Sequence, residues 1–116
     1  MQILKRRSEF RAAAKGKRIA RRGFVLQARR RRVPDAPPRF GFTVTRKTGI
    51  AVARNRIRRR LKAAVAQAES HAQKATDYVL VGRRDALTLS FARLVDDLKS
   101  GLDESARGPA AANRAR

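Results

Sequence analysis

Residues 50–72 have the sequence IAVARNRIRRRLKAAVAQAESHA, and this stretch determines how the rest of the chain is interpreted. At 100° per residue its apolar side chains fall on one stripe, with the spacing of a helix that packs against a core. The stripe consists of Ile57, Leu61, Ala64, Val65 and Ala68. Polar side chains fall within an arc of about 140° on another side of the same helix; these are Arg54, Asn55, Arg58, Arg59 and Lys62. The stretch therefore predicts a helix with one face in a core and another covered by cations.

Alternating apolar residues on both sides of this helix predict a small sheet. Residues 23–30 and 39–46 alternate with a period of two. Residues 77–82 are predicted as a third strand, in which the run Tyr78-Val79-Leu80-Val81 is apolar on both faces, as is typical of a central strand. A short helix is predicted over residues 8–15, with Ser8 as its N-cap, and a last amphipathic helix follows Ser90.

The predicted order is helix, strand, strand, helix, strand, helix, which is an α/β sandwich of the α+β kind, a small sheet packed by helices. Residues 1–102 would form a single domain that binds its partner through the cationic helix. Residues 103–116 contain no large apolar side chain and are predicted to be a disordered tail.

Net charge points to the class of partner. The 116 residues include 30 Lys and Arg against 9 Asp and Glu, for a formal net charge of +21. Residues 1–62 hold 22 of these basic residues and only two of the acidic ones. An excess of this size indicates a polyanionic partner. No stretch is long and apolar enough for a membrane span, so a cytoplasmic protein with no membrane partner is expected. An Arg-rich start also fits a mitochondrial transit peptide, but the apolar pattern continues through it.

Catalytic chemistry has little support in the sequence. The chain has no cysteine and one histidine, which excludes disulfides, thiolate chemistry and Cys/His zinc sites. Asp96 and Asp97 point about 100° apart on a helix and would not share a proton. We therefore predict no catalytic residue, no metal site on the protein and no small-molecule substrate. Guanidinium groups on one helix face can instead hold phosphates and fix the register of a folded RNA.

A merely solvated charged face is the alternative interpretation of the cationic helix. Such a face would mix acids with its bases, whereas Asp35 is the only acid between Glu9 and Glu69. Like charges on neighbouring turns repel each other, so the bare helix is expected to be marginally stable unless an anion lies between them.

Four segments occur in unbroken order along the chain. The first is Phe10 followed, after thirteen residues, by Phe24-Val25-Leu26. The others are RFGFTVTRKTG at 39–49, AVARNRIRRRLK at 51–62 and DYVLVGR at 77–83. Together these segments resemble the bacterial ribonuclease P protein component. The resemblance covers roughly residues 3–102, and its most specific part is Arg54-Asn55-Arg56 with the basic pair Arg46-Lys47 before it.

The resemblance implies a protein subunit of ribonuclease P. Such a subunit binds a catalytic RNA and the 5′ leader of precursor tRNA, and it assists magnesium-dependent endonucleolytic removal of the leader. The magnesium would be bound mainly by the partner RNA, and the protein alone would be non-catalytic. A left-handed strand–helix–strand connection is also implied, although about 98% of such connections are right-handed.

The resemblance further implies two groups of site residues. RNA contacts would come from Arg46, Lys47, Arg54, Asn55, Arg56, Arg58, Arg59 and Lys62. The leader would bind in a cleft beside the first helix, lined by Phe10, Val25, Gln27 and Arg29.

Two departures from the family weaken the cleft. Ala14 stands where many members have a second aromatic residue, and Gln27 where some have a tyrosine. The leader would lose stacking worth about 1–3 kcal/mol per base, and its binding would depend more on charge. The alternative function is a ribosomal or other structural RNA-binding protein without a processing role, which would share the size, the charge and the lack of catalytic residues. The ordered cationic face, with Phe10 at a distance before it, favours ribonuclease P.

Overall fold

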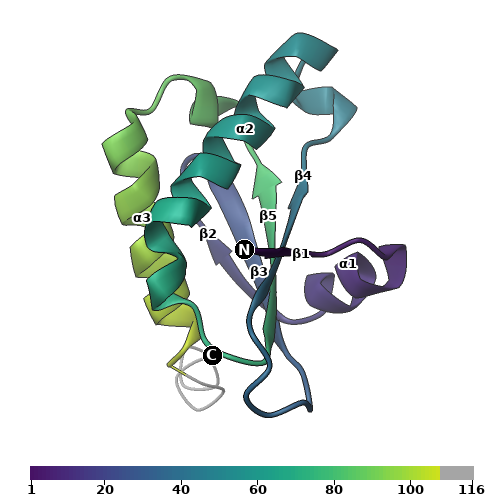
Figure 1. The fold of residues 1–116 in the computed structure, drawn as a ribbon. Helices are drawn as coiled ribbons and strands as arrows, with labels where there is room; N and C mark the ends of the chain where they lie inside the picture. The colour runs from purple at the N-terminus through teal and green to yellow at the C-terminus, as the bar shows by residue number, and fades with distance from the viewer. Residues whose placement is uncertain (108–116) are drawn as a thin grey trace, which may run out of the picture.

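The computed structural model describes residues 1–107 and contains a five-stranded mixed sheet with helices on both faces (Figure 1). Across the sheet the strand order is β1-β4-β5-β3-β2. The strands are β1 (Gln2–Ile3), β2 (Lys17–Ala20), β3 (Phe24–Arg30), β4 (Arg39–Thr43) and β5 (Thr76–Gly82). The helices are α1 (Arg7–Ala14), α2 (Ala51–Ala68) and α3 (Phe91–Ser105), with 3-10 turns η1 (Arg46–Thr48), η2 (Glu69–His71) and η3 (Arg84–Leu87). This architecture confirms the predicted fold class.

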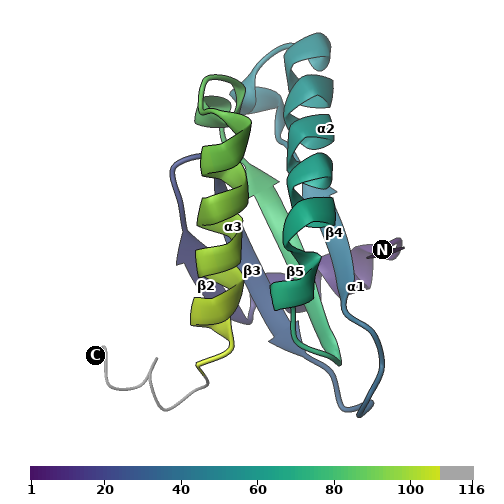
Figure 2. The same cartoon turned by 60° about the vertical axis from the view of Figure 1, so that its left-hand side comes forward.

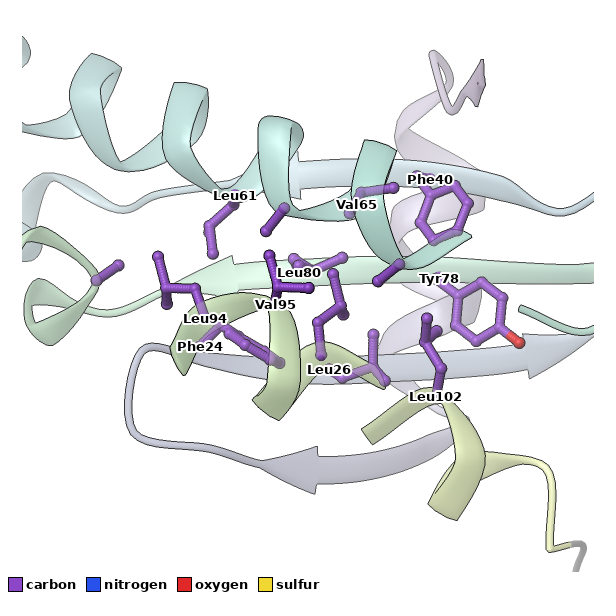
Figure 3. Packing of buried hydrophobic residues seen from close by; sticks show 14 of the residues in the cluster. Phe24, Leu26, Phe40, Leu61, Val65, Tyr78, Leu80, Leu94, Val95 and Leu102 are labelled. Atoms are coloured by element: carbon purple, nitrogen blue, oxygen red, sulfur yellow. The ribbon is translucent and has the colours of Figure 1, made fainter. Parts of the chain in front are cut away.

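The main core lies between the sheet and the helices α2 and α3. These two helices lie side by side on one face of the sheet, and α1 lies on the other face (Figure 2). Period-two alternation decides which residues of β3 enter this core, so Phe24 and Leu26 point towards α2 and α3 (Figure 3). The whole predicted stripe of α2 is buried there, each residue with 0% exposure: Ile57, Leu61, Ala64, Val65 and Ala68.

Helix α2 connects two adjacent parallel strands, β4 and β5. Seen with α2 in front and both strands running upwards, β5 lies to the left of β4, so the crossover is left-handed as expected (Figure 2). Gly82 at the end of β5 permits close packing of the helix, because a Cβ there would lie 2.6 Å from Cγ2 of Ile57. The N-terminal half of α2 therefore packs closely against the sheet.

A smaller cluster holds α1 against the opposite face of the sheet. Leu4, Ala13 and Val79 are buried in it, and Phe10 packs against them. The ring of Phe10 lies directly over β4, since a Cβ on Gly41 would be 2.6 Å from its Cε1 atom. The glycine at this position therefore lets the aromatic ring contact the strand backbone.

Arg39 of β4 makes charged contacts with Asp77 of β5 and with Glu9 of α1. Its Nε and Nη2 atoms donate to the carboxylate of Asp77 at 2.8 and 2.7 Å, and its Nη1 lies 2.7 Å from Oε2 of Glu9. Asp77 is only 2% exposed and also lies 3.0 Å from Nε of Arg31. Hydrogen bonding to Asp77 raises the pKa of Arg39 above its ordinary value. Buried carboxylates are found with such partners because an unpaired buried charge is costly.

Several element boundaries differ from the sequence-based prediction. The N-cap of α1 is Arg6 instead of Ser8, because Glu9 accepts hydrogen bonds from the backbone of Arg6 and Lys5 and so starts the helix earlier. Strands β1 and β2 were not predicted: β1 has two residues, and β2 has Ile19 as its one large apolar side chain. The long helix ends at Ala68, where the 3-10 turn η2 begins.

The end of the last helix also differs from the prediction. Ser90 is its N-cap as predicted, with its Oγ accepting from the backbone N–H of Arg93 at 3.1 Å. Helix α3 continues to Ser105, so a disordered tail beginning at residue 103 is wrong for residues 103–105. Lys17 explains the extension, because its ammonium group donates to the terminal carbonyl of Ser105 at 3.1 Å. Residues 108–116 of the predicted tail lie outside the described residues.

Acid should weaken the attachment of α1 through Glu9. The hydrogen bond from the backbone N–H of Arg6, with the nearby Arg39, lowers the pKa of Glu9 below its ordinary value of 4.5. A carboxylate with a lowered pKa stabilises the fold above pH 4.5, and this contribution is lost as the pH falls through the lower folded-state value. Urea unfolding at about pH 6 and about pH 3.5 should show a smaller loss of stability for Glu9→Gln than for the unaltered protein.

Asp35→Asn provides the control, because Asp35 is 89% exposed and its carboxylate lies 3.9 Å from the ammonium group of Lys74. Its acid-induced loss of stability should equal that of the unaltered protein. If Glu9→Gln also loses as much stability as the unaltered protein, Glu9 makes no such contribution.

Candidate nucleic-acid interface

The outward side of α2 presents a cationic surface. The helix carries six basic side chains and no acidic one. Four of the predicted RNA-contacting residues on it are exposed, namely Asn55, Arg56, Arg59 and Lys62. Arg54 and Arg58 are half-buried, and Arg46 and Lys47 are exposed in η1, just before the helix. The structure therefore brings all eight predicted residues together along α2 and its N-terminal end.

Two of these arginines are held in place by hydrogen bonds. Nε of Arg54 donates to the carbonyl oxygen of Gly49 at 3.2 Å. Nη1 of Arg58 donates to Oδ1 of Asn55 at 3.1 Å, one turn earlier on the helix. A guanidinium group has five N–H donors, and a side-chain amide has two more, so each group retains donors for a ligand. These contacts orient the donors before any RNA binds.

Arg60 has a different role from its neighbours. Its Nε donates to the carbonyl oxygen of Ala86 at 2.8 Å, and its Nη2 donates to that of Leu89. Both acceptors belong to the connection between β5 and α3, and Arg60 is half-buried against it. This arginine therefore fixes the position of α2, which agrees with its absence from the predicted RNA contacts.

The charges on α2 have no compensating acid among residues 1–107. The ion pairs found there use basic residues from other parts of the chain: Arg21, Arg22, Arg31, Arg39, His71, Lys74 and Arg93. A helix surface of this kind repels itself and attracts phosphate.

The predicted cleft residues lie together on the face of the sheet that α1 occupies. Val25, Gln27 and Arg29 alternate with core residues along β3 and so share this face with Phe10. Phe10 and Gln27 are half-buried and Arg29 is exposed. Val25 is only 5% exposed, so little of its side chain is accessible to a ligand.

One further basic residue, absent from the predicted set, lies on this face of the sheet. Arg18 of β2 pairs in register with Gln27 of β3, and it is exposed. It lies on the cleft face because its neighbour Ile19 points into the main core. The sequence offers almost no signal for it, because Ile19 is the one large apolar side chain of the four residues of β2.

A family model described as Ribonuclease P matches residues 1–105. The chain belongs to the ribonuclease P protein family. It is thus a subunit of the ribonuclease P holoenzyme, an endoribonuclease of tRNA processing whose other component is the ribonuclease P RNA. This membership decides against the alternative of a ribosomal protein.

Individual relatives agree with the family assignment. The ribonuclease P protein component of Gluconacetobacter diazotrophicus is 46% identical over 101 residues, which cover 85% of this chain and 86% of that protein. The corresponding protein of Caulobacter vibrioides (strain NA1000) is 42% identical over 100 residues, which cover 85% of this chain and 67% of that protein.

Solved structures of ribonuclease P proteins share the fold. The Staphylococcus aureus protein superposes with a TM-score of 0.70 at 27% identity, covering 86% of this chain and 91% of that one. The Thermotoga maritima protein has a TM-score of 0.74 at 23% identity, covering 90% and 97%, and this likeness concerns the fold alone. No helix within residues 1–107 combines the length and apolar character needed to cross a membrane.

Substitution of two adjacent arginines, Arg59 and Arg60, should change the free energy of unfolding in opposite directions. Arg59 has Arg56 and Lys62 one turn away on either side, and each such like-charge pair costs about 0.2–0.5 kcal/mol. Arg59→Gln should therefore raise the free energy of unfolding by up to about 1 kcal/mol at low salt. Arg60→Gln should lower it by about 1–3 kcal/mol, because two carbonyl oxygens lose their donors.

Urea denaturation of both variants at low and high salt would test these effects. The gain from Arg59→Gln should shrink as salt screens the repulsion, whereas the loss from Arg60→Gln should persist. Destabilisation by both substitutions would show that the charges on α2 do not oppose folding.

Proposed function

We propose that the α2 surface binds the ribonuclease P RNA and that the cleft beside α1 binds the 5′ leader of precursor tRNA. The protein would thereby assist magnesium-dependent removal of the leader by the catalytic RNA, and this work would take place in the cytoplasm, where precursor tRNA is present. The observation that carries the proposal is the set of six basic side chains on α2, which have no acidic partner within residues 1–107.

Arginine geometry supports phosphate recognition by α2. A guanidinium fork can hold a phosphate through two parallel hydrogen bonds, which fixes orientation as well as attraction. Arg54 and Arg58 are already oriented by their contacts with Gly49 and Asn55, so less side-chain entropy is lost on binding. Contacts of this kind position the protein on a folded RNA without reading its sequence.

The cleft suits a single-stranded leader. Bases of any sequence can stack on an aromatic ring, and Phe10 is half-buried at the edge of the open sheet face. Arg29 and Arg18 are exposed on the same face and can contact the leader backbone, while the amide of Gln27 can hydrogen-bond a base. Ala14 is exposed one turn after Phe10 and offers no second ring.

Magnesium is assigned mainly to the partner RNA in this proposal. Magnesium prefers carboxylate oxygens and phosphates. The α2 surface is cationic and carries no carboxylate, which supports magnesium held mainly by phosphates of the RNA. The protein's contribution is to position RNA phosphates.

Reconstitution tests the proposed function directly. The purified protein is added to the ribonuclease P RNA of the same organism and to precursor tRNA at low magnesium concentration. We expect faster leader removal with the protein than without it, and no cleavage by the protein alone. Cleavage by the protein in the absence of the RNA, or no stimulation of the RNA, would overturn the proposal.

The salt dependence of RNA binding tests the contact at α2. Loss of one phosphate contact lowers the log–log slope of affinity against salt by about 0.7–0.9. Arg59→Gln should show this change with the ribonuclease P RNA, even though it stabilises the free protein. An unchanged slope would exclude a phosphate contact at Arg59.

Phe10→Ala tests the leader cleft. In the reconstituted holoenzyme, this substitution should weaken binding of precursor tRNA by about 1–3 kcal/mol, which is one stacking contact, and leave mature tRNA unaffected. Ala14→Ser, at an exposed position on the same helix, is the control and should change neither. Equal weakening of precursor and mature tRNA would remove Phe10 from the leader site.

A further inference from the structure

Three exposed arginines lie together at the end of the sheet where α2 begins. Arg22 belongs to the turn between β2 and β3, Arg83 directly follows β5, and Arg84 begins η3. Together with Asp85 they line one open concavity. None of them is part of the RNA contacts that the family resemblance assigns to α2.

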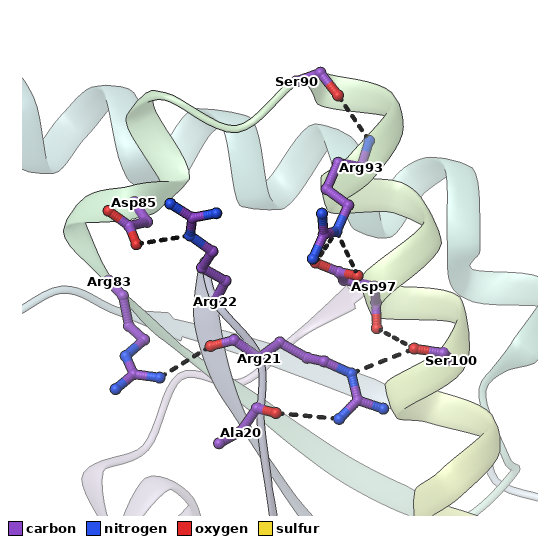
Figure 4. Close-up of polar contacts among 9 residues, drawn as sticks. All are labelled: Ala20, Arg21, Arg22, Arg83, Asp85, Ser90, Arg93, Asp97 and Ser100. Atoms are coloured by element: carbon purple, nitrogen blue, oxygen red, sulfur yellow. Dashed lines mark hydrogen bonds and ion pairs between the residues drawn. The ribbon is translucent and has the colours of Figure 1, made fainter.

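Backbone carbonyl groups hold two of these arginines in place. Nη1 of Arg83 donates to the carbonyl oxygen of Arg21 at 2.9 Å (Figure 4). The backbone N–H of Arg83 also donates to the carbonyl oxygen of Gly23 at 3.0 Å, so the end of β5 is fixed to the β2–β3 turn. The position of Arg83 is therefore determined by the fold.

This cluster is continuous with the α2 surface. Nη1 of Arg84 donates to the carbonyl oxygen of Thr48 at 3.0 Å, and Nε of Arg54 donates to the next carbonyl, that of Gly49. Two guanidinium groups, one from η3 and one from α2, are thus attached to consecutive peptide units. Arg60 makes the opposite connection, from α2 to the carbonyl oxygens of Ala86 in η3 and of Leu89 after it. These contacts hold η3 and α2 as one surface.

The concavity has an excess of positive charge. Asp85 is the only acid that lines it, against three arginines. Asp85 lies 3.2 Å from Nε of Arg22, and the two side chains are 49% and 63% exposed, so this ion pair contributes little to stability (Figure 4). An exposed pair of this kind can exchange its carboxylate for a phosphate at small cost.

We propose that Arg22, Arg83 and Arg84 form a second phosphate-binding site, and that its occupant is the backbone of the ribonuclease P RNA. This inference rests on the proposed function and extends it, because the RNA held by α2 continues over the end of the sheet. Continuity with the α2 surface favours RNA over another polyanion. Asp85 competes with phosphate for Arg22 and so weakens binding at this site.

Two substitutions that change the charge of the site in opposite directions test the proposal. Arg22→Ala should weaken binding of the ribonuclease P RNA and lower the log–log salt slope by about 0.7–0.9. Asp85→Asn should tighten binding severalfold, since Arg22 is released from its competitor. Neither side chain has a hydrogen-bond partner other than the other in residues 1–107, so both variants should fold.

Matched controls separate a local contact from the general effect of net charge. Arg107→Ala and Asp103→Asn change the same charges at the C-terminal end of α3, far along that helix from η3. If Arg22→Ala and Asp85→Asn only match these controls while Arg59→Gln lowers the slope, the second site is refuted and the proposed function stands. The proposed function fails on a separate result, which is reconstitution in which the unaltered protein does not stimulate leader removal by the RNA.

A measurement on the assembled holoenzyme identifies the occupant. Arg22→Ala should leave the affinity of the preassembled holoenzyme for precursor tRNA unchanged. A loss there, with unaltered affinity for the ribonuclease P RNA, would assign the site to tRNA and overturn the stated occupant.

Discussion

The fold depends on burial of the apolar stripe of α2, because this packing outweighs the repulsion between the basic side chains on the same helix. Ile57, Leu61 and Val65 are fully buried against the sheet, and each contributes in proportion to the apolar area removed from water. This packing allows the opposite side of the helix to carry basic residues without acidic partners. The same side chains therefore oppose folding of the free protein and favour binding of RNA, so stability and affinity are coupled through the charges of α2.

Arginines in this chain divide into those that build the fold and those that remain available to a ligand. Arg60 and Arg39 use several donors on carbonyl or carboxylate oxygens and connect separate elements. Arg56 and Arg59 are exposed and make no side-chain hydrogen bond within residues 1–107. Arg54 lies between these cases, because one donor holds the turn before α2 and the others remain for phosphate. Neighbouring positions of one helix thus serve different purposes.

Periodicity was sufficient to predict some parts of the structure. The buried stripe of α2 and the alternation of β3 are strong patterns, and both were predicted correctly. Strand β2 escaped detection because a strand of four residues with one buried apolar side chain has almost no pattern. The end of α3 depends on Lys17, which is distant in sequence. Crossover handedness came from the family resemblance alone, since the general rule favours the opposite hand. Charge alone does not distinguish Arg59 from Arg60. The family resemblance left Arg60 out of the RNA contacts, and the packing of η3 beside the helix gives the physical reason.

The α2 surface and the proposed leader cleft lie on opposite sides of one sheet, and β4 connects them. Arg39 and Gly41 of β4 position α1 and its Phe10, while the chain after β4 leads through η1 directly into α2. The chain after α2 leads into β5, which pairs in parallel with β4 and places Phe42 opposite Leu80. Both ends of α2 are therefore connected to neighbouring strands of the sheet. Because the strands form a rigid layer, a leader bound beside α1 and a ribozyme bound along α2 would be held at a fixed separation. Positioning of this kind assists catalysis without a catalytic side chain on the protein, since correct placement of substrate and catalyst itself lowers the barrier.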